Sequence, residues 1–266
     1  MRLARFVTPD GRTVTGRLVD ERTAEPLVGA LFGTLEFAAA RVAVARFLPP
    51  VEPPNIFAIG RNYRAHAAET GAAVPERPMI FMKPTTALLG DGGTIVLPVA
   101  APDEVDYEAE LAVVIGRPAR CVPEERALTY VLGYTCANDV SARDCQRSDK
   151  QWARAKGFDT FCPLGPWLVT ADALDPGDLR ICSRLNGRVM QDARTSAMLH
   201  SCRALVSYLS HQFTLLPGTV ILTGTPEGVG MARTPPVFLR PGDRIEVEIE
   251  GIGTLTNSVA GPTAAP

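Results

Sequence analysis

Asp106-Tyr107-Glu108-Ala109-Glu110-Leu111-Ala112-Val113-Val114-Ile115-Gly116 is the stretch that decides how this chain folds. Because successive side chains of a strand point to opposite faces, a strand here places Asp106, Glu108 and Glu110 on one face. It places Tyr107, Leu111, Val113 and Ile115 on the other face. These carboxylates repel one another, and burying them is costly unless a cation or hydrogen-bond donors neutralise them. Ala112 and Val114 continue the same face as an apolar one, which favours a buried face over a solvated one on an exposed strand. The stretch therefore predicts a core strand that carries a site for a hard divalent metal.

Composition narrows the class of protein. The chain has 266 residues, 46% of them hydrophobic, so it can bury a sizeable core. A formal net charge of −2 from 27 basic and 29 acidic residues offers no basic stripe for nucleic acid and no anchor for a membrane surface. Apolar runs are strand-sized, and the first residues do not open a signal peptide, so we expect a cytoplasmic protein. The six cysteines form no C-x-x-C pair, and we expect mostly buried, reduced thiols.

The first fifty residues differ in pattern from the rest. Residues 1–48 alternate weakly, with Asp10-Gly11 as an expected hairpin turn, which predicts a small N-terminal β unit. The proline-rich segment 49–54 is typical of a linker. We therefore expect a small N-terminal β domain with its linker over 1–50, a large second domain over 51–260 and a loose tail over 261–266.

Strand-like runs outnumber helical ones after the linker. Strands are expected at 55–59, 79–82, 94–97, 105–115, 131–138, 161–169, 180–186, 219–223, 244–249 and 253–258. Helices are expected at 62–69, 123–130 and 201–213. This balance favours a β-rich α+β fold over a doubly wound one.

A second candidate site lies in the expected helix at 62–69, which Asn62 could cap. His66 and Glu69 are three residues apart and so share a helix face. A carboxylate beside an imidazole orients the ring and raises its basicity, as a general base requires. The alternative is an ordinary surface His–Glu pair.

Two further stretches carry polar groups after apolar runs. Asp139 could be a third metal ligand or the cap of a short helix. Arg143 and Gln146 could bind a substrate carboxylate or carbonyl through hydrogen bonds. Lys156 could stabilise an enolate oxygen or be a solvated turn residue. The glycine loop at 223–230 lacks the lysine of a phosphate-binding loop, so no nucleotide site is expected.

Six motifs in a fixed order make this chain resemble the fumarylacetoacetate hydrolase family over about residues 51–259. They are N-Y-x-x-H-x-x-E, F-x-K-P, Y-E-x-E-L-x-V-V-I-G, N-D-x-S-A-R-D-x-Q, A-K-x-F-D and L-T-G-T-P-x-G-V-G. The likeness is to bacterial members with one catalytic domain, among them acylpyruvases and 2-hydroxyhepta-2,4-diene-1,7-dioate isomerases. It implies a mixed β-sandwich roll, usually a homodimer, with one Mg²⁺ or Mn²⁺ per subunit.

The motif matches also imply roles for single residues. They give Glu108, Glu110 and Asp139 as metal ligands, His66, Glu69 and Lys156 as catalytic residues, and Arg143, Gln146 and Thr225 as substrate-binding residues. Asp106 lies on the same predicted face as Glu108 but matches no ligand position. The His66–Glu69 dyad matches one that acylpyruvate-cleaving members carry on a lid helix. Small residues also follow the dyad, so we expect residues 62–78 to form a mobile lid; they are Ala67, Ala68, Gly71, Ala72 and Ala73.

The chemistry implied by the resemblance is that of an enolate. A 2-oxo acid can bind a metal ion through its carboxylate and 2-oxo oxygen, and the ion then stabilises the enolate formed when a bond at C3 breaks. We expect C–C bond hydrolysis of acylpyruvates or decarboxylation of oxaloacetate-like substrates. The alternative is isomerisation or decarboxylation of a 2-hydroxyhepta-2,4-diene-1,7-dioate, of the 5-carboxymethyl-2-hydroxymuconate type, in aromatic catabolism. A second alternative is a non-catalytic metal-binding relative, which would need neither the dyad nor Lys156.

Overall fold

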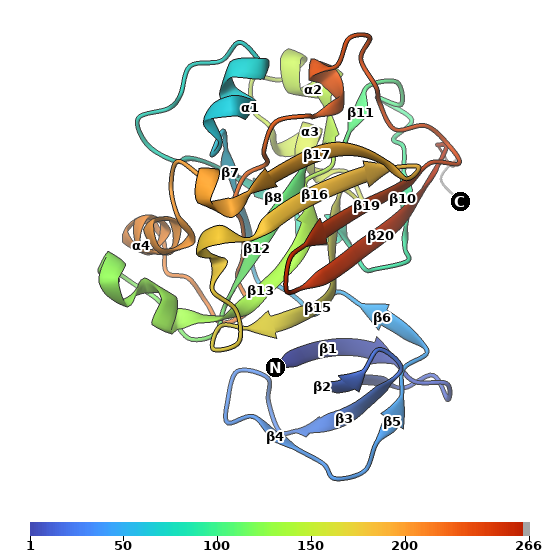
Figure 1. The fold of residues 1–266 in the computed structure, drawn as a ribbon, viewed down its shortest axis with the longest axis vertical. Helices are drawn as coiled ribbons and strands as arrows, with labels where there is room; N and C mark the ends of the chain where they lie inside the picture. Colours follow the sequence, from blue (N-terminus) through green and yellow to red (C-terminus); the bar gives the residue numbers. More distant parts are fainter. Residues whose placement is uncertain (263–266) are drawn as a thin grey trace.

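A long mixed β-sheet runs through the part of the chain that the computed structural model describes, residues 1–262 (Figure 1). Its strands are β1 (Arg2–Val7), β2 (Thr13–Asp20), β3 (Thr23–Val28), β4 (Glu36–Phe37), β5 (Val42–Ala43), β6 (Arg46–Leu48), β7 (Ile56–Gly60), β8 (Met79–Lys83), β9 (Leu88–Leu89), β12 (Ala109–Ile115), β13 (Val131–Asn138), β15 (Cys162–Thr170) and β18 (Val220–Leu222). The hydrogen-bonded order is β4-β3-β2-β1-β15-β13-β12-β18-β7-β8, and β5, β6 and β9 pair with β3, β1 and β15 beside this path.

A second sheet packs across the middle of the first (Figure 1). Its strands are β10 (Thr94–Val96), β16 (Arg180–Leu185), β17 (Arg188–Arg194), β19 (Arg244–Ile249) and β20 (Gly253–Ala260), in the order β10-β20-β19-β16-β17. Leu111 and Val113 of β12 share the main core with Val247 and Leu255 of this sheet. Two sheets facing each other across a common apolar layer form a sandwich, and the predicted β-rich α+β fold is confirmed.

The helices are short and lie at the margins of the sandwich (Figure 1). They are α1 (Arg64–Glu69), α2 (Arg143–Ser148), α3 (Ala153–Gly157) and α4 (Cys202–Gln212). The helix expected at 123–130 is instead the 3₁₀ helix η2 (Glu124–Tyr130), and strand β13 starts at the next residue. No helix within residues 1–262 is long and apolar enough to cross a membrane. The described residues contain no disulfide, and only Cys121 of the six cysteines is exposed.

Asn62 does not cap α1, contrary to the expectation. The N-cap residue is Tyr63, which makes no side-chain capping bond. The Asn62 amide instead donates to the carbonyl oxygens of Thr223 at 2.7 Å and His200 at 2.9 Å, and it accepts from the His200 N–H at 2.8 Å. These bonds hold the Asn62 side chain between two loops and away from the start of the helix.

The stretch expected to be one strand over 105–115 is broken in two. A short strand β11 (Val105–Asp106) pairs with β14 (Ser141–Ala142), and β12 starts only at Ala109. The break occurs because the Asn138 side chain accepts the Glu108 N–H at 2.9 Å, in place of a backbone partner. Tyr107 consequently packs in a different apolar cluster from Leu111, so the prediction that they share one face is wrong.

Burial of the carboxylate face is confirmed. Asp106, Glu108 and Glu110 are 0%, 5% and 1% exposed, and Ala112 and Val114 lie in an apolar cluster of their own. The stretch therefore carries charged groups into the interior of the molecule.

The N-terminal strands β1 to β6 form the lower part of Figure 1 and are joined to the rest by the long sheet. The expected hairpin is present, since β1 and β2 pair antiparallel around the turn at Asp10 and Gly11. Strand β1 also pairs with β15, with Leu3 opposite Leu168. The expected boundaries near residues 50 and 260 stay predictions, and most of the expected tail, 263–266, lies outside the described residues.

Candidate active site

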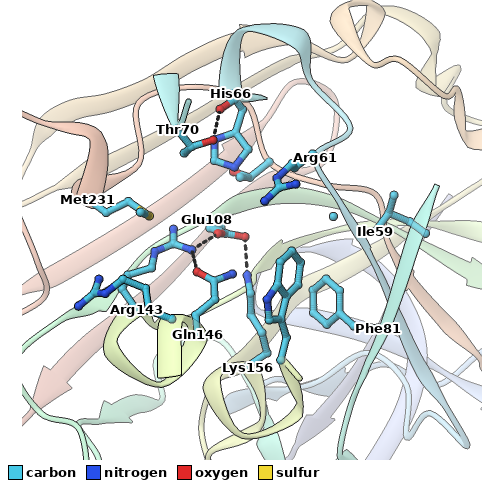
Figure 2. A pocket seen from close by; sticks show the side chains of 14 residues that line it. Ile59, Arg61, His66, Thr70, Phe81, Glu108, Arg143, Gln146, Lys156 and Met231 are labelled. Carbon is cyan, nitrogen blue, oxygen red and sulfur yellow. Dashed lines mark hydrogen bonds and ion pairs between the residues drawn. The ribbon is translucent and has the colours of Figure 1, made fainter. Parts of the chain in front are cut away.

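A cavity of about 240 Å³ lies where β7 and the helices α1, α2 and α3 meet (Figure 2). It is smaller than the roughly 300–1,000 Å³ of pockets that bind drug-sized ligands. Its lining combines four cationic side chains with the aromatic rings of Phe81 and Trp152. The lining residues are Ile59, Gly60, Arg61, His66, Thr70, Phe81, Glu108, Arg143, Gln146, Arg147, Trp152, Lys156, Thr225 and Met231. These dimensions and charges suit a small anion.

Three carboxylates meet beside this cavity, and one of them, Glu108, lines it. Glu108, Glu110 and Asp139, here called the carboxylate triad, each offer an oxygen, and the three oxygens lie within 4.8 Å of one another. They converge because β12 and β13 are antiparallel neighbours, with Glu110 opposite Ala137, so the start of one strand adjoins the end of the other. Asp139 is thus not the cap of α2, whose N-cap is Ala142.

Buried cations hold two members of the triad. The Lys156 ammonium donates to Glu108 Oε2 at 2.8 Å and to Asp139 Oδ2 at 2.7 Å, and Lys83 pairs with the other Asp139 oxygen. Arg143 Nη1 contacts Glu108 Oε1 at 2.7 Å. Burial alone would raise the pKa of Glu108, but Lys156 and Arg143 outweigh it and hold this pKa below its ordinary value.

Glu110 is the member without a cation. Within residues 1–262 it forms no ion pair, and its Oε2 accepts only the Gly224 N–H, at 2.6 Å. Burial, together with the charges of Asp139 and Glu108, raises the pKa of Glu110 well above its ordinary value. A divalent cation would relieve this repulsion, and an all-oxygen ligand set fits Mg²⁺ or Mn²⁺. The residues present therefore fit the metal that the resemblance implies.

Asp106 has a structural role that is separate from the carboxylate triad. Its carboxylate accepts from the backbone N–H groups of Tyr107, Gly230 and Met231 at 2.7 to 3.0 Å, and from Arg143 Nε at 2.9 Å. It therefore ties the glycine loop to Arg143. Sequence reasoning gave Asp106 no role, and its place on the carboxylate face was the only signal.

Arg143 is held rigidly at the edge of the cavity (Figure 2). Its Nη1 also donates to Gln146 Oε1 at 3.0 Å, while its Nη2 is buried without a hydrogen-bond partner. An unpaired buried donor is costly. A substrate oxygen bound beside Arg143 would satisfy it, and the amide N–H groups of Gln146 could donate to the same ligand.

His66 of the His66–Glu69 dyad lines the cavity and lies above Glu108 in the view of Figure 2. His66 Nδ1 lies 2.8 Å from Glu69 Oε1, and Glu69 Oε2 accepts the Gly228 N–H at 2.8 Å. An ionised carboxylate can only accept, so the neutral tautomer of His66 that fits this bond has the proton on Nδ1 and the lone pair on Nε2. His66 is buried, which sets it apart from an ordinary surface pair.

Thr225 is more constrained than expected. Its hydroxyl donates to the Ala109 carbonyl at 2.9 Å and accepts from Gln191 Nε2 at 2.7 Å, so only a lone pair faces the cavity. Gln191, on β17, also accepts the Ala109 N–H and the Ser183 hydroxyl. No motif pointed to Gln191, because Ala109 and Thr225 lie 82 and 34 positions away from it in the sequence.

The structure thus brings all nine predicted site residues to one place. Six line the cavity, Glu110 and Asp139 adjoin Glu108, and Glu69 contacts His66. Their roles stay predictions.

Comparison with known proteins gives consistent relatives. Residues 55–260 match the family described as fumarylacetoacetate (FAA) hydrolase C-terminal. The human mitochondrial oxaloacetate tautomerase FAHD2A is 47% identical over 217 residues, which cover 80% of this chain and 69% of that protein. Among solved structures, a 5-carboxymethyl-2-hydroxymuconate delta-isomerase from Mycobacterium smegmatis is 47% identical with a TM-score of 0.88, covering 98% of this chain and 100% of that one. A 2-hydroxyhepta-2,4-diene-1,7-dioate isomerase from Mycobacterium marinum is 44% identical with a TM-score of 0.88, covering 99% and 100%.

Proposed function

This chain belongs to the fumarylacetoacetate hydrolase family, and on that premise we propose that it moves a proton at C3 of a small 2-oxo acid, as a tautomerase or isomerase. The observation that carries the proposal is the buried carboxylate triad facing a histidine base across a cationic cavity. The relatives named as a tautomerase and as isomerases support proton transfer ahead of bond cleavage.

The triad would hold Mg²⁺ or Mn²⁺, whose charge would stabilise negative charge on the oxygens of the bound acid. Lys156 keeps a positive charge beside Glu108 and Asp139, next to where that charge develops. Arg143 Nη2 and the Gln146 amide orient the acid by donating to its oxygens.

His66 carries the proton. Its Nε2 accepts a proton from C3, and Glu69 stabilises the imidazolium that forms. Glu69 in turn is fixed by the Gly228 N–H, so the ring cannot turn away. Return of the proton to the 2-oxo oxygen completes a tautomerisation, and return to a more distant carbon of a conjugated acid shifts the double bond.

A second candidate is the C–C hydrolysis of acylpyruvates. The same His66–Glu69 dyad, buried against the cavity, could take a proton from water that attacks C4. Decarboxylation of an oxaloacetate-like acid needs no attacking water and would not depend on the dyad.

The test is a panel of oxaloacetate, acetylpyruvate and an unsaturated heptanedioate, each with Mg²⁺ or Mn²⁺. We expect enol–keto conversion or double-bond migration to give the highest kcat/KM, and His66→Ala to abolish it while leaving Mg²⁺ affinity nearly unchanged. A large loss of Mg²⁺ binding in that variant would place His66 among the ligands and contradict the assignment.

Deuterium exchange at the methyl group of pyruvate, followed by ¹H NMR in D₂O with Mg²⁺, tests the shared first step. Glu108→Gln should abolish the exchange, and Glu125→Gln, at an exposed position, should not. Absence of any metal-dependent exchange in the wild type would favour the non-catalytic metal-binding alternative.

The assembly and location remain proposals as well. We propose a homodimer, which light scattering on the eluted protein would test. A cytoplasmic location stays a prediction. The human relative is named as a mitochondrial protein.

A further inference from the structure

Positive charge dominates the lining of the cavity. Four cationic side chains reach it, against the one carboxylate of Glu108; they are Arg61, Arg143, Arg147 and Lys156. Buried carboxylates hold Arg143 and Lys156, and Glu104 pairs with Arg147 at 2.6 Å. Arg61 is different, because its guanidinium forms no ion pair or hydrogen bond with any residue of the described range 1–262.

The backbone presents Arg61 to the cavity at some cost. Arg61 follows the last residue of β7 and has a φ of 56°, in the left-handed region that residues with a Cβ rarely adopt. Such strain persists where the surrounding structure enforces it, often at binding sites. Figure 2 shows the half-buried guanidinium extending into the cavity, between His66 and the side of the cavity that holds Phe81.

We infer that Arg61 binds the second carboxylate of the substrate, and that this residue makes the site select short 2-oxo dicarboxylates over 2-oxo acids with an uncharged end. The inference rests on the proposed function, in which the 2-oxo acid end of the substrate lies at the triad and Arg143. A guanidinium pairs with a carboxylate through two parallel hydrogen bonds. An acylpyruvate would instead place an uncharged acyl group against Arg61 and leave this cation unpaired.

The other cations are less suited to the second carboxylate. Arg147 is exposed and already paired with Glu104. Arg143 contacts Glu108 and therefore lies at the triad end of the substrate. Arg61 alone combines an open guanidinium with a position across the cavity from Arg143 (Figure 2).

Two substrates that differ at one group test the inference. Oxaloacetate and acetylpyruvate share the 2-oxo acid, but C4 carries a carboxylate oxygen in the first and a methyl group in the second. Arg61→Gln should lower kcat/KM for oxaloacetate by about 100-fold, mainly through KM, because one charged pair to the substrate is lost. It should change acetylpyruvate turnover by less than about 3-fold, and Arg61→Lys should restore part of the oxaloacetate activity. Arg64→Gln, on the exposed face of α1, is the matched control and should change neither substrate.

Binding separates this inference from the proposed function. Titration calorimetry with Mg²⁺ should show tighter binding of 2-oxoglutarate than of 2-oxopentanoate, and Arg61→Gln should abolish the difference. The inference is overturned if Arg61→Gln lowers kcat/KM equally for both substrates, or lowers the affinity equally for both ligands. It is also overturned if neither kcat/KM nor affinity falls. If the wild type turns over neither substrate but Arg61 still sets the binding preference, the proposed function fails and the assignment of Arg61 stands.

Discussion

At the scale of single residues, the site is a buried cluster whose charges do not balance. Among the described residues, the buried carboxylates are Asp106, Glu108, Glu110 and Asp139, and the buried lysine and arginine residues are Lys83, Arg143 and Lys156. Four negative groups therefore face three positive ones, and the unmatched charge falls on Glu110. This imbalance is an electrostatic cost that a bound divalent cation would remove.

Glu110→Gln should stabilise the metal-free protein and remove its response to Mg²⁺. The substitution keeps the acceptor for the Gly224 N–H and removes a charge that is unpaired in the interior, which should add about 1–3 kcal/mol to the free energy of unfolding. In the wild type, Mg²⁺ at 100 times its dissociation constant should add about 2.7 kcal/mol. Urea unfolding with EDTA and with Mg²⁺ measures both effects. Equal stabilisation of wild type and variant by Mg²⁺ would remove Glu110 from the ligand set.

Asp106→Asn should destabilise the protein and lower its activity together. One oxygen can still accept the Gly230 N–H, but the new amide nitrogen faces two donors, the Met231 N–H and Arg143 Nε. Breaking a buried charge pair in this way typically costs about 3–5 kcal/mol. Urea unfolding and kcat/KM provide the measurements, with the exposed Asp103→Asn as the control. An unchanged kcat/KM would show that Asp106 does not position Arg143.

At the scale of elements, α1 owes its position to contacts rather than to its own stability. It has six residues and no side-chain cap, and isolated helices of this length do not form in water. Buried Ala67 and the bond from the Gly228 N–H to Glu69 fix it against the rest of the molecule. The helix that carries the proposed base therefore depends on these contacts to stay in place.

Two substitutions at Glu69 should separate orientation of the base from docking of the helix. Glu69→Gln can keep the bond from the Gly228 N–H but no longer holds His66 as a carboxylate does, and Glu69→Ala loses both contacts. Both variants should lose about 10²–10⁴-fold in kcat. Only Glu69→Ala should show faster hydrogen exchange over residues 62–78, and oxalate, a mimic of the enolate, should slow this exchange in the wild type. Identical exchange in all samples would argue against a lid.

The elements that sequence reasoning found are those with long, regular patterns. Strand β13 has the expected bounds, Val131–Asn138, because its apolar run is long enough to define it. Helices α2 and α3 were missed, since six and five residues are too few to show a helical period. Their places are instead set by distant contacts of Arg143 and Lys156 with the buried carboxylates. The motifs predicted which side chains gather at the site, but not pairings such as Lys83 with Asp139 across 56 positions.

At the scale of the whole molecule, the N-terminal strands cover an edge that would otherwise be open. All nine residues of β15 are buried, and β1 pairs along one end of this strand. An unpaired apolar edge strand is a template for pairing with other chains. The N-terminal unit therefore protects this edge of the sheet from pairing with other chains, whether or not the unit has an activity of its own.

Removal of residues 1–48 should consequently cause association of the remaining chain. The β15 edge near Leu168 and Val169 would lose its partner, so we expect higher oligomers by light scattering and a lower Tm than for the full chain. Leu3→Pro provides a milder version, because proline opposite Leu168 lacks the N–H that the ladder needs. Mg²⁺ binding should survive in any truncated chain that stays folded, since every triad residue lies beyond the deletion. A shortened chain with unchanged Tm and the same assembly as the full chain would show instead that the two parts are independent, and the covering of β15 would then contribute nothing to stability.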